Sequence, residues 1–155
     1  KSHTVALIQI ATEDTCFLFR INRTGFTPTL KTLFEDPNIT KIGLSLKDDF
    51  SMLHKIAPFE PKGFIELQSY VKQFNIEDMS LQKIYANLFG EKISKNQRLS
   101  NWEADVLSEG QKLYAATDAW ACVEIYNCLS ELESTGNYEI IQNEPIESTV
   151  TIDGL

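Results

Sequence analysis

A tyrosine and an aspartate four residues apart, Tyr114 and Asp118, have the types and spacing for hydrolytic chemistry. They lie in the run YAATD, inside a segment that reads as a long helix, where about 3.6 residues per turn place the two side chains about 40° apart on one face. A carboxylate can bind a hard cation, and a phenol one turn away can hold a water molecule beside it. Because many helices contain this spacing by chance, the spacing indicates a functional site only together with the surrounding sequence.

Asp118 lies within the otherwise apolar stretch YAATDAWACVEIY. An aspartate in the middle of a helix is unfavourable by propensity, and a buried carboxylate without a partner is unfavourable because it loses its hydration. A bound cation would offset that burial. The structural alternative places Asp118 at the exposed edge of the helix, and Tyr114 at the edge of the core with its hydroxyl in water.

A second acidic site follows a predicted strand over residues 40–46, where Asp48 and Asp49 precede a short helix with the sequence FSMLHKI. Either carboxylate can act as the N-cap of that helix by accepting free backbone N–H groups. A carboxylate at the end of a strand can also face a ligand, because ligands of open α/β sheets often bind there. We assign Asp48 to the cap and Asp49 to the functional site.

Cationic and aromatic residues beside the long helix admit two interpretations each. Lys92, Lys95 and Arg98 form a loose basic cluster. These side chains either lie in a solvated loop or contact phosphate groups. Three aromatic side chains can stack on bases but are expected in the core, and they are Phe89, Trp102 and Trp120. His54 is expected to be a solvated surface residue.

The elements that must position these residues alternate between strands and helices. Strands are predicted over residues 4–11 and 15–21, as a hairpin, and then over 40–46 and 63–67, with a helix over 68–74. The tail contains two segments, NYEIIQ and STVTI, that can each form an edge strand. This order predicts an α/β fold in which a mixed sheet is flanked by helices.

Three helices begin with capping signatures, at Thr27, Ser80 and Ser108. The third signature has the Ser108–Gln111 spacing of a capping box. It begins the long helix that carries Tyr114 and Asp118 and ends near Gly136.

Composition narrows the functional classes. The chain has 155 residues, 43% of them hydrophobic, which suits one domain with one core. Its net charge of −8 argues against a broad, non-specific nucleic-acid coat, but it permits an enzyme that binds a nucleic-acid end through metal ions. No leader or membrane-length apolar run is visible, and three cysteines without a C-x-x-C pair favour a reducing, cytoplasmic setting.

Together these segments resemble the DEDDy-type 3′→5′ exonucleases, within the branch of ribonuclease D and the Werner-syndrome exonuclease. The run LSNWEADVLSEGQKLYAATDAWACVEIY is similar to the third motif of the family, and KIGLSLKDDFSML to the second, with Asp49 at the position of its metal-linked aspartate. TVALIQIATEDTCFLF resembles the second and third strands, and SLQKIYANLFGEKISK the connecting helix. The resemblance covers roughly residues 4–132.

The resemblance implies a ribonuclease H-like fold and hydrolysis of phosphodiester bonds at the 3′ end of a nucleic acid. It implies a two-metal site, for which hard carboxylate oxygens suit Mg²⁺ or Mn²⁺. Carried over by position, Asp118 would bind one metal, Asp49 the second metal or its water shell, and Tyr114 would orient the attacking water. The expected partner is therefore nucleic acid with a free 3′ end, DNA or RNA, and no membrane.

The sequence departs from the family at the first motif, an Asp-x-Glu pair on the strand before TVALIQI. Here that strand begins three residues after Lys1, and Glu13 and Asp14 lie in the turn beyond it. We expect residues 1–136 to be an exonuclease-like domain without its first strand, as a piece of a longer protein, and residues 137–155 to be a C-terminal extension. The alternatives are a catalytically inactive module that binds nucleic acid or protein, and a metal-independent scaffold.

Overall fold

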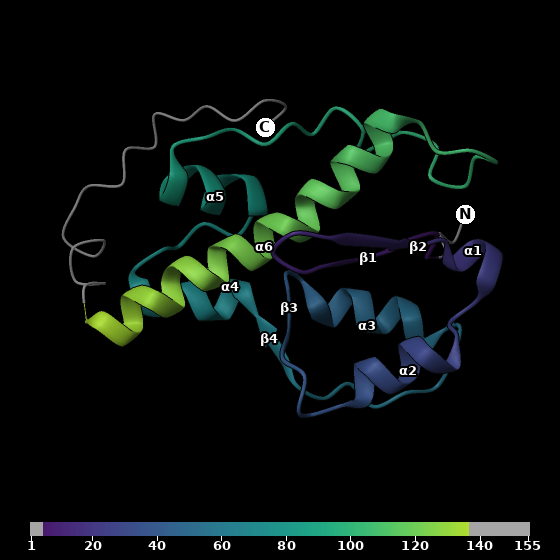
Figure 1. Ribbon diagram of the computed structural model, residues 1–155, viewed down its shortest axis with the longest axis horizontal. Coiled ribbons are helices and arrows are strands. Elements are labelled where there is room, and N and C mark those ends of the chain that lie inside the picture. The colour runs from purple at the N-terminus through teal and green to yellow at the C-terminus, as the bar shows by residue number, and fades with distance from the viewer. Residues whose placement is uncertain (1–4, 137–155) are drawn as a thin grey trace.

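The computed structural model describes residues 5–136, in which two pairs of strands are surrounded by helices (Figure 1). The long helix α6 runs across the molecule and contacts β1, β2, β3 and α5. In chain order the described elements are β1 (Ile8–Ala11), β2 (Cys16–Phe19), α1 (Ile21–Thr24), α2 (Pro28–Glu35), β3 (Lys41–Gly43), α3 (Leu46–His54), β4 (Phe64–Glu66), α4 (Leu67–Tyr70), the 3₁₀ helix η1 (Val71–Phe74), α5 (Leu81–Phe89) and α6 (Glu109–Thr135).

The strands form an antiparallel hairpin of β1 and β2 and a parallel pair of β3 and β4. The predicted hairpin and the mixed strand directions are therefore confirmed. The expected single sheet is not, because within residues 5–136 no backbone ladder joins the two pairs. Each strand is also shorter than predicted, and the end of the predicted second strand is instead the short helix α1.

Helix boundaries follow the capping residues that the sequence indicated. The side chains of Thr27, Ser80 and Ser108 each accept a hydrogen bond from a backbone N–H in the first turn of the helix that follows. Gly90 and Gly136 end α5 and α6 with φ of 69° and 74°, the left-handed conformation that glycine adopts without strain. For α6, the Ser108 cap and Gly136 fix its two ends and so the position of each side chain along it.

The core consists of two clusters of buried apolar side chains. One lies between α6, α4, η1 and α5 and includes Leu67, Val71, Phe74, Ile84, Ala121, Ile125 and Leu129. The other lies between the hairpin, α2 and α3 and includes Ile8, Ile21, Leu30, Phe34, Leu53 and Phe59. Ile56, just beyond the end of α3 at His54, is 40% exposed.

The predicted edge strands NYEIIQ and STVTI lie outside the described residues. None of the helices in residues 5–136 is long and apolar enough to span a bilayer.

Candidate functional site

Tyr114 and Asp118 lie one turn apart on α6, as their spacing predicted. The capping box sets their position: the Ser108 hydroxyl accepts the Gln111 N–H at 3.1 Å, and the Gln111 side-chain oxygen accepts the Ser108 N–H at 2.9 Å. Burial raises the pKa of the Tyr114 hydroxyl above its ordinary value, and the charge of Asp118 raises it further. The phenol therefore stays protonated at neutral pH.

Asp118 is half-buried, and its Oδ1 atom is buried without a hydrogen-bond partner within the described residues. Desolvation raises the pKa of this carboxyl to about 6, although the charge of Lys95 acts in the opposite direction. A carboxylate oxygen withdrawn from water with no donor is unfavourable. A bound cation is one way to satisfy it.

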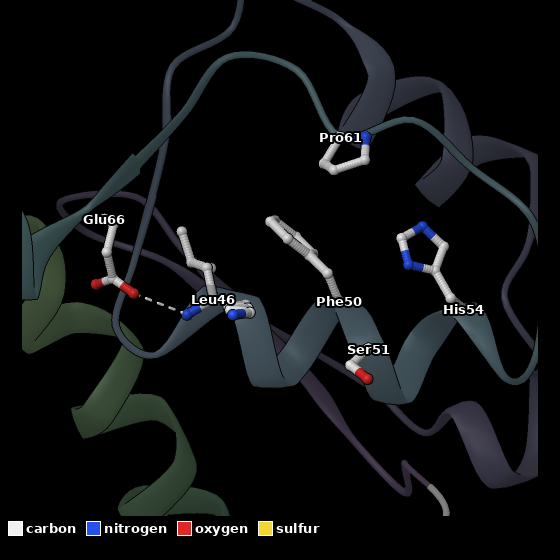
Figure 2. A pocket seen from close by; sticks show the side chains of 7 residues that line it. Leu46, Phe50, Ser51, His54, Pro61 and Glu66 are labelled. Atoms are coloured by element: carbon white, nitrogen blue, oxygen red, sulfur yellow. Dashed lines mark hydrogen bonds between the residues drawn. The ribbon is translucent and has the colours of Figure 1, made fainter.

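Asp49 lies in the first turn of α3, and the expectation that Asp48 caps this helix is wrong. Ser45 precedes the helix in the left-handed conformation, with φ of 60°, and its side chain makes no capping bond. The carboxylate of Glu66, at the end of β4, instead accepts the Leu46 N–H at 2.9 Å, as the dashed line in Figure 2 shows. Both aspartates are therefore free of capping contacts.

The carboxyl end of Asp49 is partly withdrawn from water, although the residue as a whole is exposed. This desolvation raises its pKa to about 6, and repulsion from Asp48 and Glu66 adds to the shift. Asp48 is exposed and caps no helix. Of the two neighbouring acids, Asp49 is thus the one whose environment resembles that of Asp118.

Glu66 is a polar residue of this region that the sequence analysis missed. Its Oε1 atom accepts the Leu46 N–H, and its Oε2 atom accepts the Gln68 N–H at 2.9 Å, so one side chain holds the first turns of α3 and α4 together. The signal was a charged residue next to the end of the otherwise apolar segment GFIEL, directly before a helix. A carboxylate at that point can cap a helix.

The acids meet around Cys122, one turn beyond Asp118 on α6. Burial raises the pKa of its thiol to about 12, and the charges of Asp118, Glu66 and Asp49 each contribute to the shift. Carboxylates from α6, β4 and α3 therefore lie within electrostatic reach of one thiol. Within residues 5–136, however, no three acidic, histidine or cysteine side chains lie close enough to hold a metal ion by themselves.

The loop of residues 90–108, called here the α5–α6 loop, brings cations and an indole to Tyr114 and Asp118. Desolvation raises the pKa values of Asp118 and Tyr114, and the charges of Lys95 and Arg98 respectively oppose this rise, so each cation acts on one member of the pair. The Trp102 ring lies 6.0 Å from the Tyr114 ring between centroids, and its Nε1 donates to the Arg98 carbonyl at 3.2 Å. Trp102 was expected in the core, but it lies half-buried against Tyr114 and belongs to neither core cluster.

The other residues singled out in the sequence lie elsewhere. Trp120 and Phe89 pack against the core, as expected, and Lys92 perturbs neither Tyr114 nor Asp118. His54 is exposed, but its Nε2 lies 2.8 Å from the Phe59 carbonyl oxygen and its ring stacks on Phe59. It belongs to the wall of a separate pocket.

That pocket lies on the face of α3 that carries Leu46, Phe50 and His54, opposite the segment with Pro61 (Figure 2). Its lining is mainly apolar, and neither Tyr114 nor Asp118 takes part in it. Glu66 reaches it at one end. The hollow on α3 is therefore distinct from the polar cluster around Cys122.

Two relatives in sequence match almost the whole chain. Mouse WRN, a bifunctional 3′-5′ exonuclease and ATP-dependent helicase, is 34% identical over 95% of this chain and 11% of its own length. Ribonuclease D of Gluconacetobacter diazotrophicus is 26% identical over 90% of this chain and 36% of its own length. The chain thus spans well under half the length of these relatives.

Solved structures agree with the fold. Brucella melitensis NrnC with bound Mg²⁺ is 26% identical, with a TM-score of 0.72 over 90% of this chain and 70% of the other. Together with the α/β arrangement, this confirms the predicted ribonuclease H-like class. Residues 1–132 match the family described as 3′-5′ exonuclease. The chain therefore belongs to the 3′-5′ exonuclease family, within the predicted branch of ribonuclease D and WRN.

Proposed function

We propose that this domain hydrolyses phosphodiester bonds at the 3′ end of a nucleic-acid strand, with Mg²⁺ or Mn²⁺ at a two-metal site. The observation that carries the proposal is the buried Asp118 Oδ1 atom, which has no hydrogen-bond partner among residues 5–136 and lies one turn from Tyr114. The charges of Asp118, Glu66 and Asp49 also all act on the pKa of the Cys122 thiol. Divalent ions at such a site would stabilise the attacking and leaving oxygens of the scissile phosphate. Asp118 and Asp49 are the residues that would hold them.

Tyr114 would position the water molecule that attacks the phosphorus atom. Its raised pKa keeps the hydroxyl neutral, so it can donate to one group and accept from another while it holds the water in line. Asp118 lies one turn away on the same face, so the phenol would lie beside the carboxylate that is proposed to hold a metal ion. The proposed role of Tyr114 is thus orientation rather than proton abstraction.

Lys95 and Arg98 would attract the phosphates of the strand end. Their charges act on Asp118 and Tyr114, and their side chains form no ion pair or hydrogen bond among the described residues. In a protein of net charge −8, such local cations supply the attraction that the overall charge does not. This arrangement favours binding of a strand end rather than coating of a long duplex.

Exposed apolar side chains flank the same region. Leu99, Val106 and Leu113 are 86%, 80% and 69% exposed, and all three lie in the α5–α6 loop or the first turns of α6. Large apolar side chains open to water near a polar site can pack against the faces of unpaired bases. They would guide the terminal nucleotides toward Tyr114.

The test is an exonuclease assay on strands labelled at the 5′ end or at the 3′ end, in DNA and in RNA, with Mg²⁺, Mn²⁺ or EDTA. We expect 5′-labelled strands to shorten stepwise and 3′-labelled strands to release a labelled mononucleotide, only with a divalent ion. Because the Asp-x-Glu pair of the family does not precede β1 in the printed sequence, the longest natural form of the protein is assayed beside the 155-residue chain. Binding without cleavage in both forms would instead support the inactive binding module.

A further inference from the structure

Arg20 joins the end of β2 to the α5–α6 loop through backbone carbonyl groups 82 to 85 residues away. Its Nη1 donates to the Asp105 carbonyl at 2.9 Å, and its Nη2 donates to the carbonyls of Trp102, at 3.4 Å, and Ala104. Figure 1 shows this loop on the same side of the molecule as α1, which Arg20 precedes. One guanidinium group therefore bridges three carbonyls of an irregular segment.

The surroundings of Arg20 differ from those of an ordinary surface arginine. The side chain is half-buried, and its Nε atom is buried without a partner within residues 5–136. The neighbouring cation Arg23 is more exposed: its Nη2 pairs with Asp105 Oδ1 at 2.9 Å and donates to the Ala104 carbonyl at 3.4 Å, but it makes no bond to Trp102. Because the planar fork of arginine can donate to several acceptors in fixed directions, lysine cannot replace these contacts.

The loop that Arg20 holds leads directly to Tyr114. Trp102, one of the three residues bonded by Arg20, packs its indole against the Tyr114 ring and ties its Nε1 to the Arg98 carbonyl. On the other side, Gln111 of α6 donates to Ser100 Oγ at 3.1 Å and to the Asn101 carbonyl at 3.0 Å. The loop is thus fixed on the α6 side by Gln111 and on the hairpin side by Arg20.

We propose that Arg20 is a positioning residue for the active site: it fixes the α5–α6 loop so that Trp102 holds Tyr114 in place. The effect on catalysis rests on the function proposed above, whereas the effect on Trp102 does not. Without Arg20, Gln111 still ties Ser100 and Asn101, and Arg23 still contacts the loop, but the Trp102 carbonyl loses its bond to the hairpin side. The indole then moves relative to the phenol.

The first experiment measures acrylamide quenching of Trp102 fluorescence in the 155-residue chain. Trp120→Phe leaves Trp102 as the sole tryptophan. Arg20→Lys and Arg20→Gln should raise the quenching constant at least about twofold, because a freed indole is more accessible. Arg23→Gln, which removes the exposed contacts to Ala104 and Asp105 but none to Trp102, should leave the constant unchanged. Circular dichroism checks that each variant is folded. If Arg20→Gln does not fold, Arg20→Lys alone is used for the measurement.

The second experiment is a double-mutant cycle on cleavage in the form of the protein that is active. Arg20→Lys should lower kcat about tenfold with little change in KM, and it should lower it less than about twofold in a Tyr114→Phe background. Equal factors in both backgrounds would overturn the link to Tyr114. Unchanged quenching of Trp102 in a folded Arg20→Lys variant would overturn the proposal even if no form of the protein cleaves nucleic acid.

Discussion

Asp118 on α6 and Asp49 on α3 act on the same thiol, but different kinds of contact place them there. Asp118 and Tyr114 belong to one continuous helix, so a capping box and the helical repeat fix their relation. Asp49 depends on the carboxylate of Glu66, which lies 20 residues from Leu46 and caps α3 across space. Contacts between neighbours in the chain thus position the α6 residues, whereas a contact between distant segments positions Asp49 on α3.

The largest effect is expected when either acid loses its charge. Asp118→Asn and Asp49→Asn should each reduce cleavage to about 1% or less of the wild-type rate, because both carboxylates are proposed to hold divalent ions. Single-turnover kinetics on a labelled strand measures the loss. Asp48→Asn, a change at the exposed neighbour, is the matched control. If Asp49→Asn kept full activity while Asp118→Asn lost it, only the α6 residues would contribute to cleavage. The proposed role of Asp49 on α3 would then be wrong.

Tyr114→Phe tests the α6 part by itself. Removing the hydroxyl should slow cleavage about a hundredfold, because the attacking water loses its orientation while the acids remain. Isothermal titration with Mn²⁺ should give the same affinity as the wild type. A variant that cleaves normally would show that the phenol is only a packing residue beside Trp102.

Glu66→Ala tests the α3 part. The change removes the acceptor for the Leu46 and Gln68 N–H groups, so it should destabilise the fold by about 1–2 kcal/mol and slow cleavage about tenfold through a displaced Asp49. Glu35→Ala is the control, because Glu35 also accepts a backbone N–H, from Glu60 at 2.8 Å, away from the site. Urea unfolding and kcat are the measurements. If Glu66→Ala and Glu35→Ala lost equal amounts of activity, Glu66 would have no specific role in positioning Asp49.

Lys95→Gln and Arg98→Gln test the loop that covers the α6 pair. Each should raise KM for a short single strand several-fold and reduce the slope of log K against log salt by about one, because one phosphate contact is lost. Lys112→Gln, which removes a cation already paired with Glu109 at 3.1 Å, is the control. A slope that is the same in all three variants would exclude direct phosphate contacts.

The smallest effect concerns stability without metal. The pKa values of Asp49 and Asp118 are raised to about 6 in the folded protein, above the ordinary value of 3.8, so the folded state holds these protons more tightly. The stabilisation is complete below the ordinary value and is lost as the pH rises through about 6. Relative to wild type, Asp118→Asn should therefore gain melting temperature between pH 4 and 6 and remain higher above it, by about 2–4 °C per 1 kcal/mol.

Added Mg²⁺ should reverse this difference. Above pH 6 it should raise the melting temperature of the wild type but not that of Asp118→Asn, because the ion binds the ionised carboxylate. A melting temperature difference that does not vary with pH would mean that Asp118 is not desolvated. Thermal scans monitored by circular dichroism provide both comparisons.

Predictions that depend on neighbouring residues were confirmed more often than those that depend on residues far apart in the chain. Thr27, Ser80 and Ser108 were identified as caps because a cap and its helix are adjacent in the chain. Asp48 was wrongly assigned as a cap because the carboxylate that fills that role comes from β4. Likewise, the predicted strand over residues 40–46 ends at Gly43, since Ser45 turns the backbone and α3 begins at Leu46.

The sequence alone determined the long helix, its two ends and the side-by-side placement of Tyr114 and Asp118, because a helix is specified by nearest neighbours along the chain. Only the tertiary structure decided that Glu66 caps α3, that Arg20 bonds the α5–α6 loop and that the charge of Asp49 acts on the thiol of Cys122. Each of these depends on elements that fold separately and then pack. Their partners are 20 to 85 residues apart in the chain, beyond the range of any local pattern.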